Sequence, residues 1–260
     1  MPHREERSYI FSTKNADYVN ADKNKFYVRM NQPIVIPDNA SEVDISLHSA
    51  YIWNSAPNIT TGKNKITYVV SSTTYTHTFP EGLYSLIDIN NTLKSFFIQD
   101  GLPQNTFVLS GNDISQKVSI TFNVADIIIF FGAADSISQL LGFNARPSPP
   151  PSIPPLNYVD TGDTVAKFYN VNAFVLTSET LVRDGISLNG INYNILGYIP
   201  ITSGPYELIN YSADNLILNC CNHLIGKRIS ELSFSIYNED LIPVRLIEDS
   251  QFTILIRITY

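Results

Sequence analysis

The sequence has few of the features that mark secreted or membrane-spanning proteins. It holds only two cysteines, Cys220 and Cys221. Because they are adjacent they could form only a strained disulfide, so we expect two free thiols and no disulfide framework of the secreted kind. The first residues are charged and lack the apolar stretch of a signal peptide, and no apolar run reaches the roughly 18 residues of a transmembrane helix. We therefore expect neither a signal peptide nor a membrane span.

Charged residues are also scarce. They make up 16% of the chain, against about 25% in an average soluble protein, and the net charge is −7. Lys227-Arg228 is the one adjacent basic pair, so the sequence lacks the cluster of basic residues that is typical of nucleic-acid binding. The chain does have 15 tyrosines and 14 phenylalanines, which favour strands and protein interfaces. This composition favours a protein that assembles with partners over a free monomeric enzyme.

Motifs for catalysis, cofactors and metals are absent, with one exception. There is no glycine-rich phosphate loop, nucleophile elbow or dinucleotide-binding fingerprint. Cys220 and His223 are close in sequence, but this is not the geometry of a catalytic triad. The histidines are far apart and lack metal-ligand spacing: His3, His48, His77 and His223. We therefore predict no catalytic, cofactor-binding or metal-binding residue, and no cofactor.

The exception is the tripeptide Asp160-Thr161-Gly162. Such a turn carries the carboxylate of aspartic proteases, in which two Asp residues share a proton. The residues at 163–165 and 224–228 are similar to parts of a retropepsin-like protease. However, a proline-rich segment precedes the motif where an apolar strand should lead in, and Arg228 stands where such proteases carry Asp or Asn. Asp-Thr-Gly-Asp is also an ordinary turn sequence, so a protease that uses Asp160 is the less favoured alternative.

The clearest structural pattern lies at residues 229–260. Apolar and polar side chains alternate over 232–236, 242–246 and 252–260, and polar triplets separate the three sets. A period of two with one apolar face is typical of a strand that packs on a core from one side. We expect three antiparallel strands here, and the pattern predicts a sandwich or barrel.

The same reasoning predicts a mainly β fold for the rest of the chain. A helix is expected at 83–99, with a buried stripe of Leu86, Asn90, Leu93 and Phe97, and a short helix at 136–141 should end at Gly142. Further strands are expected at 25–30, 33–36, 42–53, 65–71, 74–79, 106–110, 117–123, 165–169, 173–177, 191–201, 206–211 and 215–221. We interpret this as a single jelly-roll β-sandwich with an inserted smaller α+β domain.

The domain organisation follows from changes in composition. Residues 147–155 hold six prolines and are expected to form a stiff polyproline II connector. The expected parts are an extended N-terminal arm at 1–16, the first part of the jelly roll at 17–54, the inserted domain with its connector at 55–158, and the second part of the jelly roll at 159–260.

Two segments resemble a known family. The first begins Phe79-Pro80-Glu81-Gly82-Leu83-Tyr84-Ser85-Leu86 and ends Leu140-Leu141-Gly142-Phe143. The second runs from Ile229 through Phe234-Ser235-Ile236-Tyr237-Asn238-Glu239-Asp240 and Pro243-Val244 to Phe252 and Leu255. Together they are similar to the penton, or minor capsid, proteins of virophages and polinton-like viruses. The resemblance spans roughly half the chain and implies an upright single jelly roll, of which five copies form the capsid vertex.

The resemblance also implies partners and a location. They are further copies of the chain in a homopentamer and the major capsid protein. Residues 55–158 would project outward, and our hypothesis is that they either contact a host surface or cap the vertex. The protein would lie in the virion of an icosahedral double-stranded DNA virus after synthesis in the host cytoplasm. The arm at 1–16 would run under the shell to meet the major capsid protein. Besides the protease, a second alternative is a β-rich host-recognition module, such as a fibre head or lectin-like sandwich.

Overall fold

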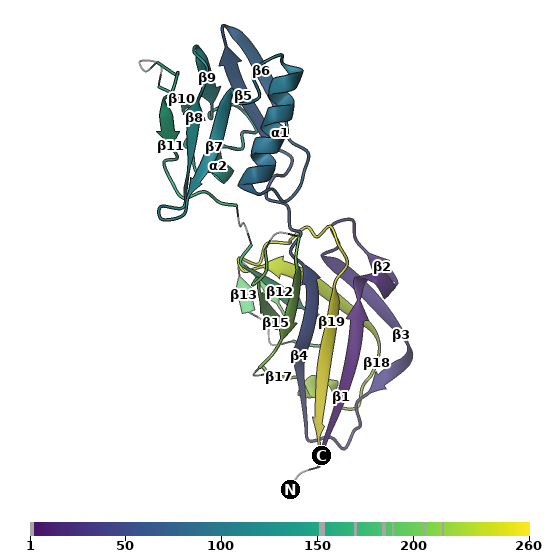
Figure 1. Ribbon diagram of the computed structural model, residues 1–260. Coiled ribbons are helices and arrows are strands. Elements are labelled where there is room, and N and C mark those ends of the chain that lie inside the picture. The colour runs from purple at the N-terminus through teal and green to yellow at the C-terminus, as the bar shows by residue number, and fades with distance from the viewer. Residues whose placement is uncertain are drawn as a thin grey trace. The chain divides into compact units, whose positions relative to one another are not determined.

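The chain forms two compact units. The computed structural model describes residues 3–150, 154–168, 171–183, 186–188, 190–204, 206–214 and 216–260. The first unit consists of residues 1–56 and 171–260, and the second of residues 57–170 (Figure 1). The second unit is thus inserted into the sequence of the first.

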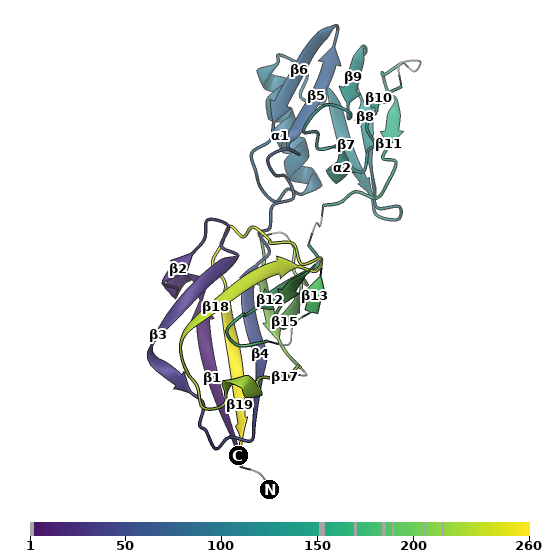
Figure 2. The same cartoon turned by 180° about the vertical axis from the view of Figure 1, so that it is seen from behind.

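The first unit is a sandwich of two antiparallel sheets. One sheet has the order β1 (Arg4–Ser12), β19 (Gln251–Thr259), β4 (Glu42–Trp53) and β16 (Leu208–Ser212), with β17 (Asn219–Cys220) also beside β4. The other has the order β15 (Ile195–Pro200), β12 (Ala173–Thr177), β18 (Arg228–Asn238), β3 (Lys25–Val35) and β2 (Tyr18–Val19). Figure 1 presents the first sheet to the viewer, and Figure 2 presents the second.

The strand order is that of a jelly roll. When β1, β3, β4, β12, β15, β16, β18 and β19 are numbered 1 to 8 along the chain, the sheet orders are 1-8-3-6 and 5-4-7-2. This confirms the predicted mainly β fold with a jelly-roll sandwich. The insertion lies between the third and fourth of these strands, β4 and β12, which belong to opposite sheets.

Alternating side chains build the core of the sandwich. In β4, Val43, Ile45 and Leu47 are buried as their period of two predicts. Phe234 packs between the sheets against Phe26, with 5.0 Å between ring centroids, and Phe26 lies 6.0 Å from Phe252. Burying such a side chain contributes about 1.5–3 kcal/mol each.

The expected N-terminal arm at 1–16 is wrong, because most of it is a strand of the sandwich. Strand β1 pairs antiparallel with β19 along its whole length, from Arg4 opposite Thr259 to Ser12 opposite Gln251. Phe11 lies in the core, where its ring is 5.2 Å from that of Phe234. Charged residues occupy the first half of β1, so its sequence lacks a clear alternation of apolar and polar residues. The sequence therefore did not reveal the strand.

The C-terminal region has two strands where three were expected. The outer ones are β18 and β19, but residues 242–246 form a loop with a single bridge between Tyr237 and Pro243. The Asn238 side chain accepts hydrogen bonds from the amides of Asp240 and Ile242, and this folds the chain back. Val244 and Leu246 are still buried, so their alternation reflects a loop that covers the core.

Several shorter strand predictions also differ from the structure. The strands expected at 25–30 and 33–36 are one strand, β3, which continues through Pro33. The strand expected at 215–221 is reduced to β17, and the described residues of 165–169 contain no strand. Residues 169 and 215 lie outside the described part of the chain. The prediction at 191–201 is divided between β14 (Ile191–Tyr193) and β15.

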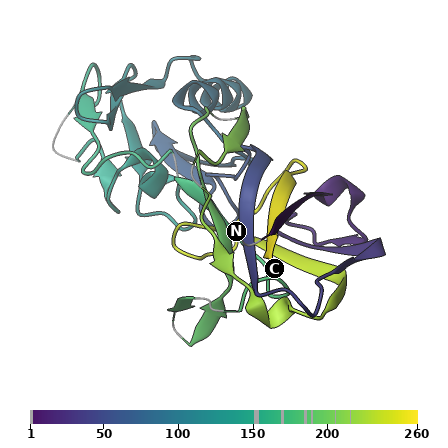
Figure 3. The same ribbon diagram turned by 90° about the horizontal axis from the view of Figure 1, so that it is seen from below.

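Small elements complete the first unit. Strand β13 (Ile186–Leu188) forms a hairpin with β14. Two 3-10 turns, η1 (Thr13–Asn15) and η2 (Asn222–Leu224), follow β1 and β17. Figure 3 views the sandwich from the end that carries both chain termini.

The second unit combines two small sheets with helix α1 (Leu86–Gln99) and helix α2 (Ser138–Leu141). One sheet has the order β10 (Pro147–Ser148), β9 (Ile127–Phe130), β5 (Lys65–Val70) and β6 (Thr73–Thr78). The other has the order β11 (Val159–Thr161), β8 (Lys117–Phe122) and β7 (Phe107–Asn112). These elements enclose a core of their own around Tyr68, Phe97 and Phe107.

Local signals explain both helices. Ser85 and Asp88 form a reciprocal capping box that starts α1, and Leu93 and Phe97 are buried as predicted, while Ile89 joins them in place of the predicted Leu86 and Asn90. Helix α2 ends at Gly142, which has the left-handed φ of 79°. A Cβ at Gly142 would lie 2.4 Å from the Thr164 carbonyl oxygen, so the position requires glycine.

The boundaries of the inserted unit differ from those expected. It ends at residue 170 instead of 158, because β11 pairs with β8 inside it. Part of the expected proline connector is also a strand: Pro147 and Ser148 pair with β9 at the edge of the sheet, a place where proline is tolerated. Residues 151–153 of that connector lie outside the described residues. Strand β9 was not predicted, because its run of isoleucines has no alternation.

Replacing Phe11 by alanine should destabilise the first unit by about 3–5 kcal/mol, because it empties a core position. Ile10→Ala is the matched control, since Ile10 lies on the same strand and is exposed. The free energy of unfolding can be followed by the fluorescence of Trp53, the one tryptophan of the chain. Equal effects of the two substitutions would contradict the role of β1 as a core strand.

Candidate interaction surfaces

An uncharged face with exposed apolar side chains covers part of the first sheet. We call it the tryptophan face and define it by Ile10, Tyr51, Trp53 and Leu208, which are 67%, 37%, 40% and 43% exposed. The register places Trp53 opposite Leu208, and Tyr51 between Gln251 and Asn210. Opposed residues of an antiparallel pair point to the same side, so these side chains share the outer surface of the sheet.

The outward-facing strand residues next to the tryptophan face are neutral, and the charged strand residues of this sheet lie toward its other end. There, Arg257 lies between Glu6 and Asp44, and its Nη2 is 2.9 Å from Glu6 Oε1. Partial burial, and next the charge of Glu42, raise the pKa of Asp44 above its ordinary value. The outer surface of this sheet therefore has an uncharged half and a charged half, and the charged half is the end with the chain termini.

Tyrosines gather at one end of the outer surface of the second sheet. Val175 stands between Tyr198 and Tyr237 in the register, and the ring of Tyr193 packs edge-on against Tyr237 at 5.3 Å. Tyr198 is about half exposed. We call this surface the tyrosine face and define it by Tyr193, Tyr198 and Tyr237, which lie around the buried Val175. Tyrosine offers a large contact area and a hydrogen-bonding tip at low cost in side-chain entropy, which suits a protein interface.

The adjacent basic pair found in the sequence lies in a shallow groove of about 310 Å³ in the first unit. Lys227 and Arg228 line this groove together with Arg183, and Glu179 and Glu231 lie beside them. Arg228 begins β18 opposite Val35, near the end of the sandwich that carries the termini. The two carboxylates offset part of the positive charge.

Asp160 is locked in a structural ion pair inside the second unit. Its two carboxylate oxygens accept from Arg146, with Nη1 2.6 Å from Oδ2 and Nη2 3.0 Å from Oδ1, and Ser148 donates a further hydrogen bond. Arg146 Nε also lies 3.2 Å from Asp163 Oδ2. The hydrogen bonds that Arg146 donates to Asp160 outweigh burial and raise the pKa of Arg146 further above its ordinary value. The Asn144 amide, and next Arg146, lower the pKa of Asp163 despite its partial desolvation.

This arrangement does not fit an aspartic protease. The catalytic carboxylate of such an enzyme must share a proton with a second Asp and face a substrate, whereas Asp160 is buried and saturated by Arg146 and Ser148. Its neighbours are structural as well, since the Gly162 amide donates to the Val118 carbonyl and Thr161 Oγ1 lies 3.0 Å from Ser119 Oγ. The Asp-Thr-Gly segment closes the edge of a small sheet.

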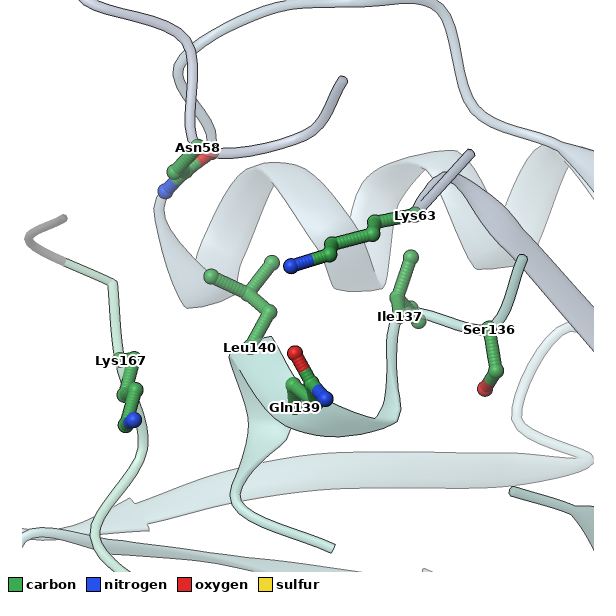
Figure 4. A pocket seen from close by; sticks show the side chains of 7 residues that line it. All are labelled: Asn58, Lys63, Ser136, Ile137, Gln139, Leu140 and Lys167. Atoms are coloured by element: carbon green, nitrogen blue, oxygen red, sulfur yellow. The ribbon is translucent and has the colours of Figure 1, made fainter. Parts of the chain in front are cut away.

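A pocket of about 230 Å³ opens beside helix α2 in the second unit (Figure 4). Lys63 extends over it from one side, and Gln139 and Leu140 of α2 form its floor. The side-chain amide of Asn58 donates hydrogen bonds to the carbonyls of Tyr84 and Phe168, and these bonds fix Asn58 in the wall of the pocket. Two ammonium groups, those of Lys63 and Lys167, suit the pocket to an acidic side chain of a partner better than to a metal ion.

The remaining residues considered from the sequence are dispersed. Cys220 is exposed and Cys221 is buried, and the two form no disulfide bond with each other. His48 lies on β4 and His223 in η2, in different surroundings from His77 of β6. Among the described residues no group of three His, Cys, Asp or Glu side chains is arranged to hold a metal ion. In the same part of the chain, no helix is long and apolar enough to cross a membrane.

One network of polar side chains could not be predicted from the sequence. Asp100, just after α1, accepts from Tyr68 Oη at 2.5 Å and contacts His77 Nε2 at 2.8 Å. The His77 ring stacks on Phe96 with 4.3 Å between centroids. Burial, and then the hydrogen bond to Asp100, raise the pKa of Tyr68 far above its ordinary range. The network ties the end of α1 to the β5–β6 hairpin and is structural.

Comparison with known proteins finds chains of similar structure among the solved structures. No family model and no curated protein matches the chain. The chain is similar to the penton protein of mavirus, with a TM-score of 0.49 and 15% identity over 98% of this chain and 100% of that chain. It is also similar to a chain in the cryo-EM structure of the Sputnik virophage, with a TM-score of 0.45 and 17% identity over 100% of this chain and 98% of that chain. Both structural similarities cover residues of the first and of the second unit.

Replacing Arg146 by methionine should destabilise the second unit by roughly 3–5 kcal/mol, because Asp160 is left buried without its counter-charge. The control is Lys65→Met in the half-exposed pair with Asp135, which should lose about 0–1 kcal/mol. Hydrogen exchange of the β8 and β11 amides measures the free energy of opening. If the two substitutions had similar effects, the ion pair of Asp160 would not be a structural element of this unit.

Asp163 should contribute to stability at neutral pH and lose that contribution in acid. Its folded pKa is lowered, so the contribution is present above the ordinary value of 3.8 and disappears as the pH falls through the lowered pKa. Between about pH 5 and about pH 2 the wild-type second unit should therefore lose more stability than Asp163→Asn. Hydrogen exchange across this range tests it, with Asp113→Asn in the exposed β7–β8 turn as the control. Parallel acid profiles for wild type and Asp163→Asn would contradict it.

Proposed function

We propose that this chain is a structural protein of an icosahedral viral capsid and that five copies form a vertex of the shell. The observation that carries the proposal is the jelly-roll sandwich with exposed aromatic or aliphatic side chains on the outer surface of both sheets. The tryptophan face exposes Ile10, Tyr51, Trp53 and Leu208, and the tyrosine face exposes Tyr198. The sequence resemblance to penton proteins of virophages and polinton-like viruses supports the same function.

The two faces suit a ring of identical subunits. They lie on opposite sheets, so contact between one face of a copy and the other face of its neighbour is heterologous. A heterologous contact repeated around an axis closes into a ring when the rotation fits, and five-fold closure is the form required at an icosahedral vertex. Burial of Trp53, Leu208 and Tyr198 would supply the apolar stabilisation.

The polarity of the sandwich supports an orientation in the shell. The charged half of the first sheet and the groove around Lys227 lie toward the end with the chain termini. The inserted unit connects the end of strand β4 to the start of strand β12. We therefore place the end with the termini toward the shell and the major capsid protein, and assign the inserted unit to the outside, where it could meet a host surface. The protein would act in the virion of a double-stranded DNA virus after synthesis in the host cytoplasm.

Introducing a charge into the tryptophan face should prevent assembly without unfolding the chain. Trp53→Glu and Leu208→Glu should each abolish incorporation into particles when co-expressed with the major capsid protein, because a carboxylate would be desolvated in the contact. The matched control is Ile98→Glu, which changes an exposed residue of α1 in the second unit. Occupancy of the vertices is measured by electron microscopy, and folding by circular dichroism. Normal occupancy with both face variants would overturn this assignment.

A further inference from the structure

Strand β6 is an open edge in the second unit. It is the last strand of its sheet and, among the described residues, pairs only with β5. Thr73, Thr74, Thr76 and Thr78 are exposed, and only Tyr75 and His77 turn inward. An exposed strand edge with unpaired amides and carbonyls is a template for pairing with another strand.

Side chains contact the other sheet edges of this unit. The edge of β7 is covered by Asn90 of α1, whose side chain donates to the Leu109 carbonyl at 2.8 Å and accepts from the Leu109 amide at 3.0 Å. The edges of β10 and β11 are joined by the hydrogen bonds that Asp160 accepts from Ser148 and Arg146. At β6, by contrast, no hydrogen bond from the described residues outside β5 reaches the backbone amides or carbonyls of Thr74, Thr76 and Thr78.

The register identifies the backbone groups that are free. Ser71 and Ser72 both have positive φ, 46° and 72°, and form a two-residue hairpin turn between Val70 and Thr73. In such a hairpin the pairs at 70–73, 68–75 and 66–77 exchange the hydrogen bonds. In agreement, Lys65, opposite Thr78, bonds instead to Asp135 and Ile137 on its other side. The amides and carbonyls of Thr74, Thr76 and Thr78 therefore point away from β5.

Nothing in the sequence of β6 protects this edge. Proteins guard exposed edges with charged residues, proline or bulges. Strand β1, an edge of the sandwich, carries Arg4, Glu5, Glu6 and Arg7. Strand β6 reads Thr-Thr-Tyr-Thr-His-Thr, with no acidic, Lys, Arg or proline residue, and its pairing with β5 has no register shift. Threonine also has a high preference for strands.

We infer that β6 pairs antiparallel with β6 of a second copy of this chain about a two-fold axis through Thr76. The strand is self-complementary in this arrangement, since Thr76 meets Thr76 and Thr74 meets Thr78. These are the residues with free backbone groups, so the contact would form about six backbone hydrogen bonds. Threonine pairs across strands are favourable, and Thr67 and Thr76 already make one at 3.1 Å between hydroxyl oxygens. No like charges are brought together.

The symmetry of this contact separates it from the proposed ring. A two-fold contact uses the same surface on both copies, and it cannot be the contact that closes a ring with an odd number of subunits. It would instead join inserted units that belong to two different rings. The inference concerns the second unit alone and does not depend on the proposed capsid function.

Substitutions at Thr76 test the inference in the full-length chain. Thr76→Pro removes an amide that points away from β5, so the hairpin keeps its own hydrogen bonds while the outer edge loses a donor. Thr76→Lys keeps the amide but brings two positive charges together at the axis. Thr76→Val is the matched control, because it keeps both the amide and the strand preference.

The measurement is amide hydrogen exchange at Thr74, Thr76 and Thr78 over a range of protein concentrations, with sedimentation velocity on the same samples. In the wild type and in Thr76→Val, these amides should become protected as the concentration rises. Thr76→Pro and Thr76→Lys should weaken this association on the order of tenfold or more, with the remaining amides unprotected at the same concentrations. Exchange in the wild type that does not depend on concentration would overturn the inference, and so would equal association of Thr76→Val and Thr76→Lys.

Discussion

The pairing of the first strand with the last is the constraint on which the sandwich depends. Strand β19 lies between β1 and β4, so the sheet is complete only when both ends of the chain are in place. The register of these three strands also sorts the side chains, placing Phe11 and Phe252 inside and Ile10 and Thr253 outside. A shift by one residue would reverse the two sides and bury the neutral polar rows in the core. The exposed tryptophan face is therefore a consequence of the same register that builds the core.

The position of the insertion follows from the topology of the jelly roll. Strands β4 and β12 belong to opposite sheets, so the chain must leave one sheet and enter the other at this point. A long connection here interrupts no hydrogen-bonded pair, and the inserted residues have a core of their own. Polar side chains contact the edges of the sheets around that core: Asn90 at β7, and Arg146 with Asp160 between β10 and β11. The motif with the strongest catalytic appearance in the sequence thus has a structural task in the inserted unit.

Local patterns were read correctly where the signal was complete within a short segment. The left-handed position at Gly142 and the alternation of Val43, Ile45 and Leu47 in β4 each led to the right element. Errors arose where a local pattern had two meanings. Val244 and Leu246 alternate like a strand but cover the core from a loop, and the charged first half of β1 looks like an arm although it pairs along its whole length. Prolines at 147–155 suggested a spacer, yet Pro147 is accepted at a sheet edge where no amide is needed.

The sequence by itself determined the mainly β class, the insertion of an α+β unit and the low fraction of charged residues. These properties depend on composition and on periodicities of two or about 3.6 residues, which neighbouring residues carry among themselves. Only the tertiary structure decided which strands are neighbours, which tyrosines share a face, and that Arg146 neutralises Asp160. Such relations join residues that are far apart in the chain, and no local pattern encodes which partner a strand or a buried charge will meet. The open edge of β6 is of the same kind, because an edge is defined by the strand that is not beside it.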